Sequence, residues 1–198
     1  MKWQALALSF LASTGLASPI DPEARDIAAQ KVYTLRLSSK EPSLDGQYLG
    51  LNGTLVGVFK AASVVRFYTV PNKKTGNVEL HTYPVGIVDH ALALVGSESH
   101  GLLDFSDVVN PESTTFPTGT KCDYTSFRLS AADDEPVARD NTLVYAGASN
   151  GRWVVFPTGN GAEWSVKWKA SSALTIQNYQ LVDVVYEPIL RAPVSESS

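Results

Sequence analysis

Three histidines are the side chains in this chain best suited to acid–base chemistry, and they stand at His81, His90 and His100. His90 directly follows Asp89, and His100 directly follows Ser99. A serine hydrolase needs a nucleophile, a base and an orienting acid that meet in space. Ser99 lacks the Gly-x-Ser-x-Gly setting of a nucleophile elbow, because a serine occupies the place of the first glycine. The sequence therefore predicts a protein that is not an enzyme, with a hydrolase that uses His90 or His100 as the alternative.

Metal and cofactor patterns are the next chemistry to consider. His81 and His90 lie nine residues apart, and the chain has no His-x-His, His-Glu-x-x-His or paired-cysteine motif of the kind that zinc sites use. The glycine-rich run 159–164 leads into a strand pattern rather than a helix, which does not suit a phosphate-binding loop. We expect no metal and no cofactor.

Cys122 is the single cysteine, so the chain forms no internal disulfide. Lys121 stands beside it, but no histidine is near in sequence. Cys122 could act as a nucleophile, as half of an intermolecular bridge, or as a small buried apolar residue. The favoured interpretation is a buried, inert thiol.

Aromatic side chains gather in the last third of the chain, where Trp153, Trp164 and Trp168 lie close in sequence. Strand alternation places Trp164 and Trp168 on one face. Such a face could stack against sugar rings as a ligand platform, or it could belong to the core. The core is the favoured interpretation of the two.

Two surface features complete the candidate sites. The triplet Asn52-Gly53-Thr54 is an N-glycosylation acceptor, so Asn52 is predicted to carry a glycan. The proline-bearing run 111–120 could present a rigid loop, and Thr115, Phe116 and Pro117 are its candidate protease-inhibitory residues.

The ends of the chain differ in character from its middle. Residues 1–17 have the positive start, apolar run and small residues of a secretory signal peptide. Residues 18–31 read as an extended lead-in or pro-segment, 32–190 as a single domain, and 191–198 as a flexible tail. The predicted localisation is therefore extracellular, either free or attached to a cell wall.

Composition narrows the range of partners. Hydrophobic residues make up 44% of the chain and charged residues 18%, which suits a globular domain. The net charge is −4 with no basic cluster, so nucleic acid is not an expected partner. No run after the signal approaches the ~20 apolar residues of a membrane span, so no integral membrane contact is expected. The sequence leaves the oligomeric state open.

The rest of the chain is dominated by a period of two, which is typical of half-buried strands. No stretch outside the signal shows a convincing 3.6-residue apolar stripe. An all-β protein is therefore predicted, with alternating or β-forming runs at 32–37, 64–70, 78–83, 125–130, 164–169 and 181–186.

Three segments, 48–59, 92–105 and 143–156, resemble one another: each reaches a glycine, crosses a short turn and ends on phenylalanine. Extended upstream, they give units of about 45–50 residues that start near Leu35, Leu80 and Phe127. Three such units predict a closed barrel like a β-trefoil, in which the runs at 32–37 and 181–186 are neighbours. A β-sandwich or another barrel is the alternative fold.

The run LVYAGASNGRWVVFPTGNGAEW (143–164) is similar to a stretch of phialide-type (PhiA-like) and conidial cell-wall proteins of filamentous fungi. That resemblance implies a non-enzymatic protein of the wall or spore surface, with a role in host interaction. The expected partners are wall polysaccharide or a host or other extracellular protein. A trefoil-type binding module, either a lectin or a protease inhibitor, is the alternative, and a secreted effector is another. The chain lacks the Gln-x-Trp triplets of ricin-type lectins.

Overall fold

The computed structural model describes residues 31–97, 99–130, 141–148, 150–159 and 162–189. These residues contain no helix, and 52% of them lie in strands or bridges, which confirms the all-β prediction. The signal peptide, most of the lead-in and the tail lie outside the described residues. The strands are β1 (Tyr33–Ser38), β2 (Gly50–Asn52), β3 (Leu55–Val58), β4 (Arg66–Pro71), β5 (Val78–Thr82), β6 (His90–Ser97), β7 (Leu102–Val109), β8 (Thr120–Asp123), β9 (Phe127–Leu129), β10 (Leu143–Tyr145), β11 (Gly151–Pro157), β12 (Trp164–Ala170), β13 (Gln180–Leu181) and β14 (Asp183–Pro188).

Each of the six runs with a β pattern overlaps a strand of the structure: β1, β4, β5, β9, β12 and β14. The alternation that predicted them is visible in their burial. In β1, for example, Tyr33, Leu35 and Leu37 are buried while the residues between them are half-buried. One face of the strand packs inward and the other meets solvent, as period-two sequences require.

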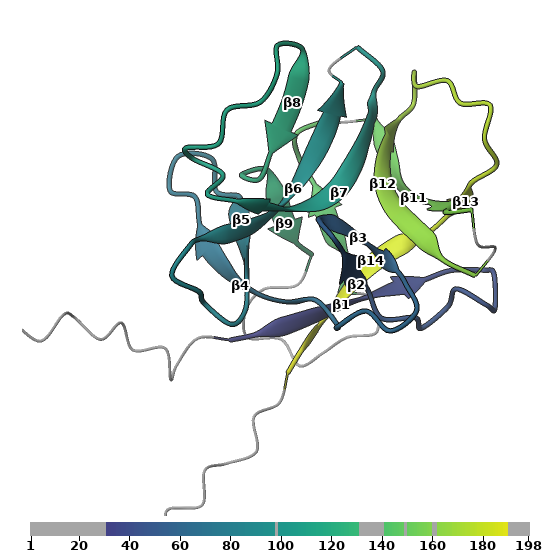
Figure 1. The fold of residues 1–198 in the computed structure, drawn as a ribbon, viewed down its shortest axis with the longest axis horizontal. Coiled ribbons are helices and arrows are strands. Elements are labelled where there is room, and N and C mark those ends of the chain that lie inside the picture. Colours follow the sequence, from purple (N-terminus) through teal and green to yellow (C-terminus); the bar gives the residue numbers. More distant parts are fainter. Residues whose placement is uncertain (1–30, 98, 131–140, 149, 160–161, 190–198) are drawn as a thin grey trace, which may run out of the picture. The chain divides into compact units, whose positions relative to one another are not determined.

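All strands belong to one antiparallel sheet that curls into a nearly closed barrel (Figure 1). Along its main path the strand order is β13-β11-β12-β3-β7-β6-β5-β4-β1-β14. The short pair β9–β10 joins β5 on one side and reaches β14 through the single bridge between Thr142 and Val185 on the other. Curling pairs most strand edges with a neighbour, which removes sites for edge-to-edge aggregation.

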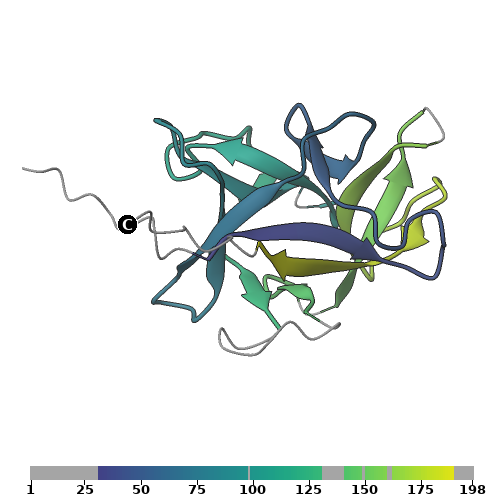
Figure 2. The ribbon, with the colours of Figure 1, turned by 90° about the horizontal axis from the view of Figure 1, so that it is seen from below.

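The first and last strands of the barrel lie side by side, as the sequence predicted (Figure 2). β1 and β14 pair antiparallel along six residue pairs, from Tyr33 opposite Pro188 to Ser38 opposite Asp183. Arg36 and Glu187 form an ion pair across these strands, and the Tyr48 hydroxyl donates to the same Glu187 carboxylate at 3.0 Å. The chain ends of the domain are therefore joined through the sheet.

The interior of the barrel is apolar and rich in aromatic rings. Phe105 packs against Phe127 and Trp153, with ring centroids 6.0 and 5.2 Å apart. Tyr145 and Trp168 extend this cluster at 5.1 Å. Buried leucines and valines fill the remaining space, among them Leu35, Leu37, Leu49, Val56, Leu80, Leu92, Leu94, Val155, Val166 and Val184.

The three similar segments do not occupy equivalent places. The first two form hairpins, β2–β3 and β6–β7. In the third, β10 pairs with β9 and β11 pairs with β12, so the segment joins two separate strand pairs. Phe105 lies in the barrel interior, whereas Phe156 contacts Tyr179 on the opposite face of β11. A trefoil of three units is not shown; the barrel is the part of that prediction that is shown.

Candidate functional site

The main path of the sheet ends at β13 and β14, and a groove follows this incompletely closed seam of the barrel. We call it the seam groove; its volume is about 970 Å3. Ligand sites commonly have volumes of 300–1,000 Å3, so it has room for a ligand. The groove is lined by the end of β1, by β10, by the start of β11 and by the segment that contains β13. The lining residues are Ser38, Ser39, Lys40, Glu41, Thr142, Leu143, Val144, Gly151, Arg152, Trp153, Trp168, Tyr179, Gln180, Leu181, Val182 and Asp183.

Two of the three tryptophans contribute to the wall of the seam groove, but most of each ring is buried. Trp153 and Trp168 are 5% and 7% exposed, and their rings meet edge to face at 5.4 Å. Trp164 is half-buried and packs against the same core. The structure therefore places these rings in the core rather than side by side on an open surface.

Trp153 also links two strands that do not pair with each other. Its indole Nε1–H donates to the carbonyl oxygen of Leu143 on β10 at 2.8 Å. In addition, the amide of Val182 donates to the carbonyl of Trp153 at 3.2 Å. The first bond joins β11 to β10, which do not pair in the sheet, and the second extends the pairing of β11 with β13.

The indole of Trp168 lies against the backbone of Gly151 at the start of β11. A Cβ atom at residue 151 would stand 2.4 Å from Trp168 Nε1 and 2.5 Å from Cε2. Trp168 Nε1 is buried and has no hydrogen-bond partner among the described residues. Only a residue without a Cβ fits against the indole at this position.

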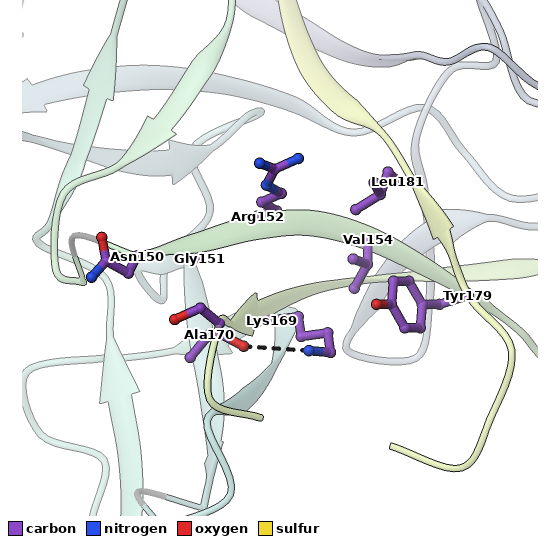
Figure 3. A pocket seen from close by; sticks show the side chains of 9 residues that line it. Asn150, Gly151, Arg152, Val154, Lys169, Ala170, Tyr179 and Leu181 are labelled. Carbon is purple, nitrogen blue, oxygen red and sulfur yellow. Dashed lines mark hydrogen bonds between the residues drawn. The ribbon is translucent and has the colours of Figure 1, made fainter. Parts of the chain in front are cut away.

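A second groove opens on the outer face of β11 and β12, and we call it the cation groove (Figure 3). Its volume is about 410 Å3, and it shares Gly151, Arg152, Tyr179 and Leu181 with the seam groove. The amine of Lys169 lies 3.4 Å from the carbonyl oxygen of Ala170 and 5.6 Å from the centre of the Tyr179 ring. The cation groove combines two cations with an aromatic and an apolar wall.

No family model, no curated protein and no solved structure matches this chain. The described residues include no helix that could cross a membrane.

Both ring nitrogens of His81 on β5 are paired with neighbouring carboxylates. Its Nδ1 lies 2.8 Å from an Asp89 carboxylate oxygen, and its Nε2 lies 3.1 Å from a Glu79 oxygen. The ring stacks on Tyr68 with centroids 5.5 Å apart. Because both ring nitrogens are engaged, this histidine has no nitrogen left for a substrate or a metal.

His90 on β6 forms a separate pair with a carboxylate. Its Nδ1 lies 2.8 Å from Asp107 Oδ2, and the ring faces a groove of about 450 Å3 beneath the segment 83–88. The hydroxyl of Thr82 lies 3.3 Å from Asp107 Oδ1 and 3.3 Å from the carbonyl oxygen of His90. The hydroxyl in this cluster is thus bound to the carboxylate and the backbone, not to the imidazole that would have to activate it.

The remaining histidine is not part of either cluster. His100 is exposed in the turn between β6 and β7, where the Ser97 and Ser99 hydroxyls bond to each other at 3.0 Å. Within the described ranges, no group of three histidine, cysteine or acidic side chains is placed to hold a metal ion.

Both surface features predicted from the sequence lie on turns or loops. Asn52 is exposed at the tip of the β2–β3 hairpin, followed by Gly53 with a φ of 61°. Thr115 and Pro117 are exposed between β7 and β8, while Phe116 is half-buried. The start of that loop is held by a bond from the Asn110 amide to the Asp89 carbonyl at 2.7 Å.

Cys122 is half-buried on β8 as a free thiol. Burial, reinforced by the neighbouring Asp123 carboxylate, raises the pKa of Cys122 to about 11. Burial also raises the pKa of Tyr145, whose hydroxyl donates to Asp123 at 2.7 Å. At neutral pH the thiol keeps its proton and is a poor nucleophile.

These raised pKa values predict that the fold loses stability in alkali. The unfolded chain releases the Cys122 proton at its ordinary pKa of 9.0, whereas the folded chain holds it until about 11. The contribution of the protonated Cys122 thiol to the free energy of unfolding is therefore fully present below pH 9 and is lost as the pH rises to about 11. Urea unfolding at a series of pH values measures how steeply the free energy of unfolding falls as the pH rises. This fall should be less steep in Cys122→Ala. A variant whose stability falls as steeply as that of the wild type would contradict this assignment.

The sequence did not single out the residues that define the cation groove. Arg152 and Lys169 lie on different strands, and Tyr179 reaches them through a long connection. The one sequence signal was the cluster of aromatic and cationic residues in the last third of the chain.

Proposed function

We propose that this protein is a secreted, non-catalytic protein of the fungal cell wall or spore surface that binds polysaccharide in the seam groove. The observation that supports this most is the open groove of about 970 Å3 along the barrel seam. An extended sugar chain needs an open groove in which tryptophan edges, a tyrosine and polar side chains are all within reach. A role in host interaction is part of the proposal.

Secretion and glycosylation are supported by the sequence. Residues 1–17 have the pattern of a signal peptide, and Asn52 of the glycosylation triplet is exposed at a hairpin tip. The similarity of 143–164 to conidial wall proteins supports the same location.

Wall association is tested by incubating the purified mature protein with isolated fungal walls, chitin and β-glucan, followed by sedimentation. We expect the protein in the pellet, with Tyr179→Ala retained less because this side chain is 37% exposed in the groove. Ile87→Ala is the control, since it removes a fully exposed apolar side chain from a different loop. Wild-type protein that stays in the supernatant with every wall material would overturn the proposal.

A protease inhibitor is the second candidate function. It is supported by the exposed Thr115 and Pro117 on a loop whose start is tied to Asp89. A panel of secreted proteases tests it: inhibition that disappears on replacing residues 115–117 with glycines supports it, and a panel without inhibition removes it.

The finer fold prediction also stays a proposal. We infer a trefoil-like relation among units that start near Leu35, Leu80 and Phe127. The β1–β14 pairing and the hairpins β2–β3 and β6–β7 support it. An experimental structure in which a threefold rotation superimposes the units would support this inference, and one without such a rotation would overturn it.

A further inference from the structure

Two cationic residues stand opposite each other in the backbone register of β11 and β12, on the outer surface of the barrel. Arg152 on β11 is the register partner of Lys169 on β12 in the antiparallel pair. Like charges directly opposite each other destabilise a sheet, and opposite charges stabilise it. Here the two side chains extend away from each other, so the groove carries a positive charge at two separate places on its wall (Figure 3).

The neighbouring lysine on β12, in contrast, is neutralised by a carboxylate. Lys167, two residues before Lys169 on β12, forms an ion pair with Asp104 at 2.6 Å. None of the described residues that line the cation groove is acidic. The chain as a whole has a net charge of −4, so this local positive surface contrasts with the rest of the molecule.

The cation groove also has an apolar side suited to a sugar ring. Tyr179 packs against Phe156 with centroids 5.7 Å apart, which holds the tyrosine ring in place. Val154 and Leu181 lie opposite each other on β11 and β13 and line the same groove. A pre-positioned ring beside two cations matches a ligand with an apolar face and an anionic group.

We propose that the cation groove binds an anionic polysaccharide, with the ring of one sugar unit against Tyr179, the carboxylate or phosphate of that unit on Lys169, and Arg152 as a second anion contact on the same groove. The planar guanidinium of Arg152 suits two-point contact with either oxyanion, and Lys169 adds a second charge. This inference rests on the proposed polysaccharide binding and assigns it a ligand class. The adjoining seam groove carries both signs of charge, Lys40 with Glu41 and Asp183, and takes the neutral part of the chain.

Isothermal titration with matched sugars tests the inference. The probes are a galacturonic acid oligomer, its methyl ester, mannose 6-phosphate and mannose. We expect the acid oligomer or the phosphosugar to bind about tenfold tighter than its neutral counterpart, which also identifies the oxyanion. Binding of the anionic sugar should weaken as salt rises, because screening reduces the attraction.

Variants locate the site. Arg152→Gln and Lys169→Gln should each weaken binding of the anionic sugar by roughly tenfold, since each removes one charged contact. Lys74→Gln is the control: it changes the net charge equally at an exposed turn between β4 and β5. Urea unfolding of Arg152→Gln should show no loss of stability, because Arg152 is exposed on the outer face of the barrel.

The outcomes separate this inference from the proposed function. Equal affinity for the charged and neutral sugars, or unchanged affinity in both glutamine variants, would overturn the anionic-sugar site. Retention on walls in that case would leave polysaccharide binding in place. Binding of the anionic oligomer by a protein that no wall material retains would overturn the wall proposal and support the site.

Discussion

Trp153→Ala should destabilise the protein by about 3–5 kcal/mol, the range for removing a buried aromatic side chain. Trp153 is 5% exposed and contacts both Phe105 and Trp168 at centroid distances of 5.2 and 5.4 Å. Its loss leaves a cavity in the aromatic core. It also removes the indole bond to Leu143 O, which joins β10 and β11 across the seam.

Trp153→Phe separates these two contributions. The ring contacts are largely kept, but the buried carbonyl of Leu143 loses its partner, which costs about 1–3 kcal/mol. Urea unfolding followed by far-ultraviolet circular dichroism gives the free energies without relying on tryptophan emission. Trp164→Ala is the control, because Trp164 is only half-buried and packs at the margin of the core. A Trp153→Ala variant as stable as Trp164→Ala would contradict the central place of Trp153.

Gly151→Ala should have the second largest effect on stability. We expect the free energy of unfolding to fall by about 3 kcal/mol, the upper end of the range for overpacked cores. The new methyl group would stand 2.4 to 2.7 Å from three atoms of the Trp168 indole. That ring cannot move away easily, because Tyr145 and Trp153 pack against its other sides at 5.1 and 5.4 Å. Either β11 or the indole must shift, and both line the seam groove.

Gly86→Ala is the matched control for this substitution. Gly86 is exposed, and the nearest atom to an added Cβ would be 3.4 Å away, an ordinary contact. Thermal and urea unfolding of the two variants should therefore differ clearly, with Gly86→Ala close to the wild type. If Gly151→Ala were equally stable, the close packing of Trp168 on the strand would be wrong.

The candidate site was only partly predictable. The sequence drew attention to Trp153 and Trp168 and favoured a core position for them, which their burial confirms. It could not find the cation groove, because Arg152 and Lys169 become neighbours only through the register of β11 with β12. It likewise placed Asp89 beside His90 in sequence, whereas the structure pairs Asp89 with His81 and His90 with Asp107.

For the fold as well, some features follow from the local sequence pattern and others depend on long-range strand pairing. Hydrophobic alternation by itself determined that the chain is all-β, and the closed barrel expected from the three similar segments predicted the β1–β14 neighbours. The third similar segment, 143–156, matched the others in sequence but does not fold as a hairpin. A period of two records which face of a strand is apolar, and that is a local property.

Only the tertiary structure decided which strands meet and where the barrel stays open. Strand partners are chosen by packing of side chains far apart in sequence, such as Phe105 on Phe127 and Trp153 on Trp168. The single bridge from Thr142 to Val185 leaves a seam beside it, and that seam creates the groove. The candidate site lies at that seam because an incompletely closed sheet leaves there a groove lined by polar and charged side chains and by Tyr179.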